Sequence, residues 1–364
     1  MTSHPRPTET IRGRGTSENP ANRFEPLHYD VEPDDETGWH PDDPDNAARP
    51  ERTQYLRDPS RRILARNDSP DVPFGVSINP YRGCEHGCIY CYARPTHEYL
   101  GFSAGLDFET RILVKQDAPE LLRRELASPR WKPQLLGLSG VTDPYQPIER
   151  STRLTRRCLE VLLEFRNPVG IVTKNALVTR DIDLLEQLAG HRAVSVHVSV
   201  TTLDPALHRV MEPRTSSPAQ RLRTIERLAH ARVPVGVMVA PVIPGLTDHE
   251  IPKILEAAAA AGARRAGFLL LRLPHGVAPL FDDWLKRHYP ARSRKVLARI
   301  RELRGGRLND PRFGSRMGGE GIYAQQIDQL FRISARRAGL DGERRALSTE
   351  AFRRPAKPQL ELFE

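Results

Sequence analysis

The stretch Val169–Thr201 reads VGIVTKNALVTRDIDLLEQLAGHRAVSVHVSVT, and it decides the fold class. It begins with a short apolar run, continues through an amphipathic segment at residues 180–188, and ends on a stretch that alternates strictly between apolar and polar side chains. A strand, a helix and a second strand in this order are typical of a parallel βα unit. The valines of the second strand are predicted to pack under helices, with Ser195, His197, Ser199 and Thr201 facing the barrel interior.

The chain repeats this pattern on both sides of that stretch. We therefore predict an α/β fold, a partial (β/α)6 TIM-like barrel, whose active site lies at the carboxyl ends of the strands. Strands are predicted at residues 75–79, 134–139, 169–173, 193–201, 233–240 and 266–271. Helices are predicted at residues 118–127, 151–165, 180–188, 218–231 and 248–261, followed by 280–289, 292–304 and 322–338.

Composition divides the chain of 364 residues into three parts. Residues 1–68 are rich in proline and charge with few core-forming side chains, which predicts a disordered N-terminal arm. Residues 69–290 are predicted to form the barrel, and residues 291–364 a helical, basic C-terminal extension with a flexible tail. Four cysteines are too few for a disulfide-stapled secreted scaffold, and no apolar stretch of about 18 residues is present. We expect a cytoplasmic protein with no membrane partner.

The formal net charge is +9, from 55 Lys and Arg against 46 Asp and Glu. The excess is concentrated in the last third, in runs such as RRAGLDGERRALSTEAFRRP at residues 336–355. Such a distribution favours a nucleic acid as partner of the basic C-terminal region, because each neutralised phosphate releases condensed counterions. It is equally typical of an ordinary solvated surface, and charge alone does not decide between the two.

Three cysteines, Cys84, Cys88 and Cys91, fall within NPYRGCEHGCIYCYA at residues 79–93. Their C-x3-C-x2-C spacing lets one loop direct three thiolates to a common centre, with Gly83 and Gly87 relieving crowding. In a reducing compartment this predicts a metal site. Zinc would need a fourth ligand such as His86 or His97, whereas a 4Fe-4S cluster on three thiolates keeps one iron uncapped.

The cysteine motif with Tyr90, placed after the first barrel strand, resembles the radical S-adenosylmethionine (radical SAM) signature. The resemblance implies that S-adenosyl-L-methionine chelates the uncapped iron of a 4Fe-4S cluster and that Tyr90 lies beside its adenine. It further implies reductive cleavage to a 5′-deoxyadenosyl radical that abstracts hydrogen from the substrate. The electron would come from an external donor such as a flavodoxin- or ferredoxin-like protein.

Further segments narrow the resemblance to the spore photoproduct lyase-like branch, also called DNA repair photolyase-like. They are TDPYQP at 142–147, TKN at 173–175 and SVTTLDPALHRVMEPRTSS at 199–217. Thr142 and Asp143 are predicted to accept the methionyl amine, and Ser199 with Thr201 to meet the ribose. The resemblance places Lys174 and Ser199 near S-adenosylmethionine, with Arg214 assisting.

The chain also departs from those families. It lacks the Gly-Gly-Glu type segment that many radical SAM enzymes carry after the second strand. Spore photoproduct lyase has a hydrogen-donating cysteine there, where this chain reads SGVT at residues 139–142. Thymine-dimer reversal by the same route is therefore not expected. Cys158 lies on an apolar helical stripe and is predicted to be core.

The last residues contain Gln359–Phe363, QLELF, which resembles the peptide by which bacterial repair proteins dock on the sliding clamp. A tail of this kind can also dock on its own domain. We predict a radical SAM enzyme of DNA repair or modification that acts on a nucleic acid. The alternatives are a radical SAM enzyme acting on a protein or small molecule, and a zinc-binding nucleic-acid module without catalysis.

Overall fold

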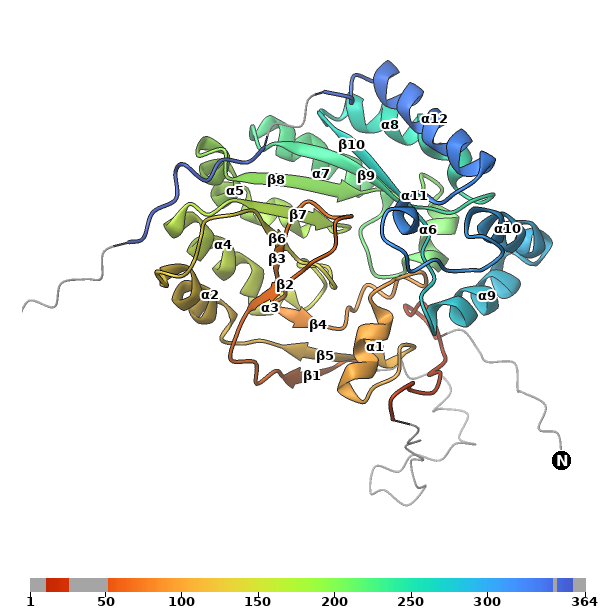
Figure 1. Cartoon of the computed structure of the whole chain (residues 1–364), viewed down its shortest axis with the longest axis horizontal. Helices are drawn as coiled ribbons and strands as arrows, with labels where there is room; N and C mark the ends of the chain where they lie inside the picture. The colour runs from red at the N-terminus through yellow and green to blue at the C-terminus, as the bar shows by residue number, and fades with distance from the viewer. Residues whose placement is uncertain (1–10, 26–51, 343–345, 356–364) are drawn as a thin grey trace, which may run out of the picture.

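The structure is a computed structural model that describes residues 11–25, 52–342 and 346–355. Its centre is a seven-stranded sheet in the order β10-β9-β8-β7-β6-β3-β2 (Figure 1). Strands β3 and β6 to β10 run parallel, and β2 is antiparallel to β3. The strands are Leu64–Arg66 (β2), Val76–Ile78 (β3), Leu136–Leu138 (β6), Val169–Thr173 (β7), Val194–Ser199 (β8), Val235–Val242 (β9) and Ala266–Leu270 (β10).

The six predicted barrel strands are confirmed with small shifts at their ends, and the architecture is the predicted α/β partial barrel. Strands β2 and β10 stand at the two ends of the sheet order. Parallel strands bring their carboxyl ends to one side of the sheet, so the loops after β6, β7, β8, β9 and β10 meet there (Figure 1).

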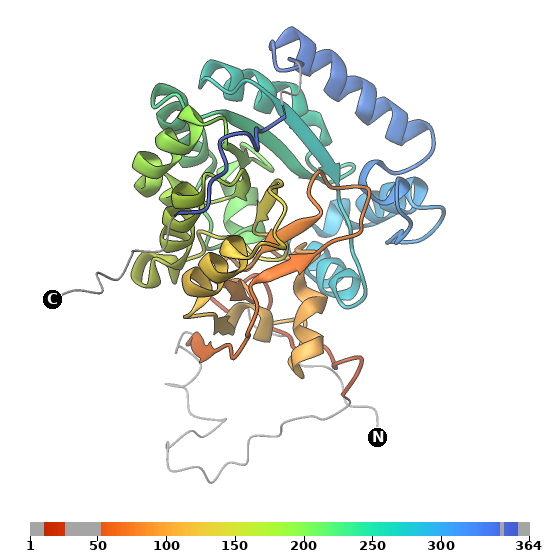
Figure 2. The same cartoon turned by 60° about the vertical axis from the view of Figure 1, so that its left-hand side comes forward.

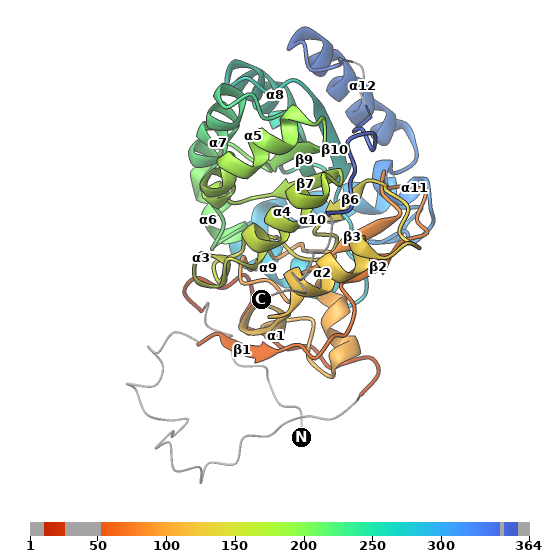
Figure 3. The same cartoon turned by 90° about the vertical axis from the view of Figure 1, so that its left-hand side faces the viewer.

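Helices cover the outer face of the sheet (Figure 3). Val194, Val196 and Val198 are fully buried in one apolar cluster with helix residues such as Leu185 and Ile225, as the alternation predicts. Cys158 belongs to the same cluster, which confirms its assignment to the core. The covering helices are α2 (Ala118–Ala127), α4 (Leu154–Phe165), α5 (Ile182–Gly190), α7 (Pro218–His230) and α8 (Ile251–Ala260).

The described part of the chain contains a second, smaller sheet in the order β1-β5-β4, which the sequence analysis missed. Its strands are Gln54–Arg57 (β1), Tyr81–Arg82 (β4) and Arg111–Val114 (β5). Short helical elements connect the larger ones. They are η1 (Arg94–Leu100), α1 (Asp107–Thr110), α3 (Glu149–Thr152), η2 (Ala176–Asp181), α6 (Pro205–Met211) and η3 (Asp248–Glu250).

The structure differs from the predicted disordered arm in two places. Residues 52–68 supply β1, which pairs with β5, and β2, which pairs with β3. Residues 11–25 lie against the barrel, where the Gly15 amide donates to Glu109 and the Ser103 hydroxyl donates to the Pro20 carbonyl. Low apolar content does not prevent order here, because backbone pairing and buried hydrogen bonds replace apolar burial. Residues 1–10 and 26–51 lie outside the described residues.

The C-terminal extension is helical, as predicted. It contains α10 (Pro290–Leu303), α11 (Ser315–Gly318) and α12 (Ile322–Arg337), and α9 (Val277–His288) precedes it within the range assigned to the barrel. Residues 346–355 run back across the outer helices, where Phe352 packs 6.3 Å from Phe165, centroid to centroid (Figure 2). The clamp-like Gln359–Phe363 lies outside the described residues. Within the described ranges, no helix combines the length and apolar character that membrane crossing requires.

Candidate active site

The three cysteines lie on one loop, residues 84–91, which we call the cysteine loop. Cys84 and Cys88 are buried and Cys91 is half-buried, and all three are free thiols. Gly83 and Gly87 adopt left-handed φ values of 77° and 66°, which confirms their expected role in turning the chain. At Gly83 a Cβ atom would come within 2.9 Å of the His97 ring, so this position also requires a residue without a side chain.

A buried arginine holds the cysteine loop from behind. Arg94 is fully buried and donates from Nε to the Cys88 carbonyl at 3.1 Å and from Nη1 to the Gly105 carbonyl at 2.9 Å. Its Nη2 forms an ion pair with Glu109 at 2.5 Å. One buried guanidinium therefore links the cysteine loop to Gly105 and Glu109.

The N-terminal segment closes over the same loop. Gly15 is buried, and its amide donates to Glu109 Oε2 at 2.9 Å. A Cβ atom at Gly15 would lie 1.8 Å from the carbonyl oxygen of Gly87. The two backbones therefore touch directly, and only glycine fits at position 15.

The three thiols of the cysteine loop are the candidate metal ligands of this site. Among the described residues, no group of three His, Cys, Asp or Glu side chains is arranged to hold one metal ion. In a 4Fe-4S cluster each thiolate binds a different iron, so the three sulfur atoms surround one cube instead of a single ion. Burial raises the pKa of all three thiols, so they need a cationic partner to ionise there. His86 Nδ1 lies 3.5 Å from a carboxylate oxygen of Asp143, and His97 Nε2 lies 2.9 Å from the Arg111 carbonyl oxygen.

A polar network lies at the carboxyl ends of β7, β8 and β9, centred on Lys174. Its Nζ donates to Ser199 Oγ at 2.7 Å, to Thr201 Oγ1 at 3.1 Å and to the Ala240 carbonyl at 2.8 Å. The ammonium also lies 5.5 Å from the centroid of the Tyr90 ring. Lys174, Ser199 and Tyr90, which come from three different segments, are thus brought together.

Glu212 is the carboxylate of this network, and the sequence analysis did not select it. It is fully buried and pairs with Lys174 at 3.2 Å and with Arg221 at shorter range. The Tyr90 hydroxyl donates to it as well. Burial alone would raise the pKa of Glu212, but the charges of Arg221 and Lys174 outweigh it and hold the pKa well below its usual range. Glu212 therefore stays ionised and fixes both Lys174 and Tyr90.

Thr142 and Asp143 lie at the end of β6, next to the network. The Thr142 hydroxyl is 2.9 Å from Ser139 Oγ. Asp143 accepts from the Thr173 hydroxyl and from the Lys174 amide, both at 2.7 Å. Burial opposes ionisation of Asp143, but His86 and these hydrogen bonds prevail and lower its pKa. The carboxylate is thus anionic and already shared among several donors.

Arg214 is placed apart from the Lys174 network. It forms an ion pair with the buried Glu85 of the cysteine loop at 3.4 Å, and its backbone amide donates to the His86 carbonyl. Glu85 also accepts from Tyr55 of β1, at 3.0 Å. Arg214 and β1 therefore brace the loop from one side. The sequence holds no local signal for this, because Tyr55, Glu85 and Arg214 lie far apart in it.

The sequence of the chain is similar to those of known proteins over the residues that build this site. A family model described as the radical SAM superfamily matches residues 78–258. An uncharacterized protein of Mycobacterium tuberculosis is 40% identical over 234 residues, covering 64% of this chain and 68% of that protein. The radical SAM Nalpha-GlyT isomerase of Pseudomonas phage M6 is 26% identical over 235 residues, covering 64% and 47%.

A solved structure shows the same fold. Spore photoproduct lyase complexed with dinucleoside spore photoproduct superposes with a TM-score of 0.55 over 78% of this chain and 79% of that one. Its sequence identity is 17%, so the likeness concerns the fold alone. The family model and the partial barrel lead to one assignment. The chain belongs to the radical SAM superfamily, a family of enzymes that bind an iron–sulfur cluster and S-adenosylmethionine.

Proposed function

We propose that Cys84, Cys88 and Cys91 hold a 4Fe-4S cluster, that the chain cleaves S-adenosylmethionine reductively, and that its substrate is a nucleic acid. The observation that carries the cofactor part is the cysteine loop itself. Three free thiols lie on one braced loop, with Tyr90 of that loop contacting the Lys174 network. When bound, the cluster and S-adenosylmethionine supply a 5′-deoxyadenosyl radical for hydrogen abstraction.

The chain's own residues bind and orient the cosubstrate. The Ser199 and Thr201 hydroxyls suit the ribose, and the Lys174 ammonium suits the methionyl carboxylate. The ionised Asp143, with the Thr142 hydroxyl beside it, suits the methionyl amine. Tyr90 offers its ring to the adenine, held by Glu212 through its hydroxyl. We assign Arg214 to bracing the cysteine loop through Glu85.

The basic surface of α10 supports a nucleic-acid substrate. Arg292, Arg294, Lys295 and Arg301 are exposed, and none forms an ion pair with the described residues. The buried face of α10 packs into the same apolar cluster as Cys88 and Tyr90 of the cysteine loop. Unpaired cations near the site give the electrostatic footprint expected for a phosphate backbone. Spore photoproduct lyase, which shares the fold, has been solved with a dinucleoside spore photoproduct, so a nucleic acid is the substrate class to test first.

The first experiment measures 5′-deoxyadenosine formed from S-adenosylmethionine under anaerobic, reducing conditions. The variant Cys88→Ala should form none, because one thiolate ligand is missing. Cys158→Ala is the matched control, since Cys158 is also a buried free thiol but lies in the apolar core with the helices. The Cys158→Ala variant should retain about four irons and four sulfides per chain and should remain active. Equal activity of the wild type and Cys88→Ala, or zinc in place of iron, would overturn the cofactor assignment.

The second experiment tests the substrate class. Binding to single- and double-stranded DNA and to RNA is measured as a function of salt, and deuterated nucleic acid is assayed for isotope transfer into 5′-deoxyadenosine. Affinity that falls steeply with salt, together with transfer, is expected. Binding that is absent at low salt would exclude a nucleic acid and leave a protein or small molecule as the substrate class.

A further inference from the structure

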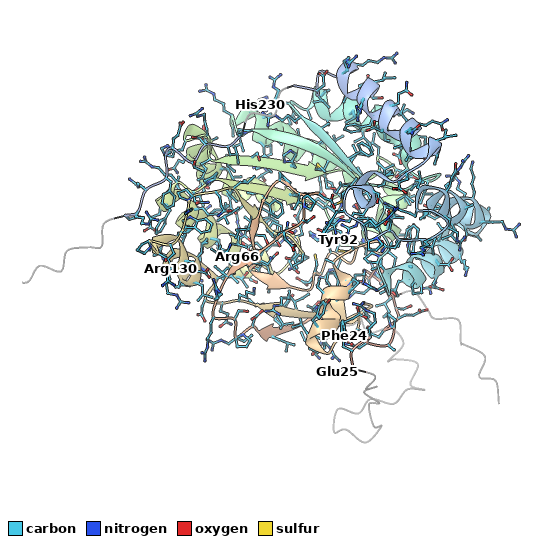
Figure 4. All side chains as sticks on the ribbon, viewed as in Figure 1. Phe24, Glu25, Arg66, Tyr92, Arg130 and His230 are labelled. Atoms are coloured by element: carbon cyan, nitrogen blue, oxygen red, sulfur yellow. The ribbon has the colours of Figure 1, made fainter. Side chains whose placement is uncertain are left out.

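Tyr92, the residue after Cys91, presents an exposed aromatic surface at the carboxyl ends of the strands. It exposes 48% of its surface, and its hydroxyl donates to the Gly140 carbonyl at 2.8 Å. Gly140 follows β6 by two residues, so this hydrogen bond fixes the ring next to the end of that strand. In Figure 4, Tyr92 lies well inside the outline of the molecule, unlike the peripheral Arg130 and His230.

Arg272 covers this ring from the opposite edge of the barrel. It follows β10 by two residues, and its guanidinium carbon lies 5.2 Å from the centroid of the Tyr92 ring. The cation–π contact orients the planar guanidinium. The fold thus brings together the ends of β6 and β10 and the residue next to the third cysteine.

The donors of Arg272 are poorly satisfied. Within the described residues, its Nη1 reaches the thioether sulfur of Met317 at 3.8 Å, and its Nε is shielded from solvent with no acceptor. A thioether is a weak acceptor. Asp71, the nearby carboxylate, is engaged by the Arg316 guanidinium and by the Gly314 amide. Arg272 therefore forms no ion pair within the described part of the chain, although the Asp71 carboxylate lies close enough to attract its charge.

The surroundings of Arg272 disfavour its charge. Burial, followed by the neighbouring charge of Arg316, lowers the pKa of Arg272 below its ordinary value. A charged group whose donors stay unmet in a partly desolvated place costs stability, and an incoming anion removes that cost. Phosphate suits such a site, because a guanidinium donates to two of its oxygens at once.

We propose that Arg272, oriented by the Tyr92 ring, binds a phosphate of the nucleic-acid substrate next to the cysteine loop. This inference rests on the proposed function, because it takes the substrate to be a nucleic acid. A phosphate held there would bring the neighbouring nucleotide to the exposed part of the Tyr92 ring, on which a base can stack. Arg272 is thus a substrate-binding residue that helps to set which nucleotide reaches the reactive centre.

The test uses the cluster-loaded enzyme and a short single-stranded oligonucleotide of mixed sequence, with binding followed by fluorescence anisotropy. A second probe has the same sequence with uncharged methylphosphonate linkages. Arg272→Gln removes both the positive charge and the paired N–H donors of the guanidinium. Arg272→Lys keeps the positive charge but not the paired donors. Arg264→Gln is the matched control. It removes an equal charge from an exposed arginine that precedes β10, at the other end of the same strand.

Arg272→Gln should weaken binding of the phosphodiester probe by about tenfold, as expected for a charge-assisted hydrogen bond, and Arg264→Gln by clearly less. The affinity of Arg272→Lys for the phosphodiester probe should lie between those of these two variants. The ratio of affinities for the phosphodiester and methylphosphonate probes should be smaller in Arg272→Gln than in the wild type. Equal effects of Arg272→Gln and Arg264→Gln would overturn the proposal, as would a wild type that binds neither probe. Loss of S-adenosylmethionine binding in Arg272→Gln would also overturn it and assign Arg272 to the cosubstrate.

These measurements need no reduced cluster and no turnover. Failure of 5′-deoxyadenosine formation in the wild type is a separate result, which concerns the proposed function. An intact cluster absorbance in each variant shows that the fold is retained. The proposal of a phosphate site at Arg272 and the proposal of radical chemistry can therefore be contradicted independently of each other.

Discussion

At the scale of single residues, the site depends on one carboxylate that serves two cations. Glu212 has no exposed surface, and Lys174 and Arg221 expose only 15% and 1% of their side chains. Removing the negative charge leaves both cations buried without compensation. We expect Glu212→Gln to lower the free energy of unfolding by about 3–5 kcal/mol, measured by urea denaturation at neutral pH.

The control for this prediction is Glu302→Gln. Glu302 pairs with Arg299 at 2.8 Å, but both side chains are at least 40% exposed. Solvent screens such a pair, so its loss should cost less than about 1 kcal/mol. Similar losses in the two variants would mean that Lys174 and Arg221 find other partners and that Glu212 does not organise the network.

His97 gives a residue-scale prediction about pH. Its Nε2 is 2.9 Å from the Arg111 carbonyl, and burial lowers its pKa from 6.5 to about 4. The unfolded chain therefore binds a proton at a higher pH than the native protein does, so stability is retained above pH 6.5 and falls as the pH drops toward 4. This one group should cost about 1 kcal/mol by pH 5.5.

The variant His97→Gln isolates that contribution, because its amide can still donate to the Arg111 carbonyl. The midpoint of thermal unfolding is compared at pH 7.5 and 5.5 for both proteins. The wild type should lose more than the variant over this interval. An identical loss in the two proteins would show that His97 does not titrate as its burial implies.

At the scale of elements, sequence periodicity predicts the barrel but not its accessories. Strands β6 to β10 are apolar runs between breaking residues, which a local pattern reveals. Strand β1 is QYLR with all four residues exposed, and its order comes from pairing with the distant β5. The same limit applies to the site. The cysteine loop is a local motif, whereas the contacts of Glu212 with Tyr90 and of Arg272 with Tyr92 exist only once the strand ends meet.

The N-terminal segment supplies a prediction at this scale. Gly15→Ala would place a methyl group 1.8 Å from the Gly87 carbonyl, so the segment or the cysteine loop must shift. We expect a loss of about 1–3 kcal/mol in unfolding free energy, as for other overpacked sites, and faster bleaching of the cluster in air. Gly190→Ala is the control, since a Cβ atom at Gly190 meets nothing within 4 Å. If the cluster of Gly15→Ala bleaches in air at the same rate as that of the wild type, the N-terminal segment does not protect the cluster.

At the scale of the whole molecule, side chains join the two ends of the open sheet. Arg304 donates to the Leu271 carbonyl beyond β10 at 2.8 Å and to the Ser315 carbonyl of α11 at 3.1 Å. From α11, Arg316 pairs with Asp71 in the loop between β2 and β3. Residues 71, 271 and 316 thus form a bridge from β10 to the β2 edge. Because Asp71 pairs with Arg316 in this bridge, Arg272 forms no ion pair of its own among the described residues.

Because this bridge consists of a few polar contacts, it should open independently of the barrel core. Asp71→Ala removes the acceptor for both Arg316 and the Gly314 amide. Amide hydrogen exchange in residues 312–320 should then become about tenfold faster, while exchange in β8 stays unchanged. Asp68→Ala, an exposed carboxylate of the same loop, should change neither. Faster exchange that spreads into β8 would mean that the bridge holds the barrel as a whole and does not open independently of it.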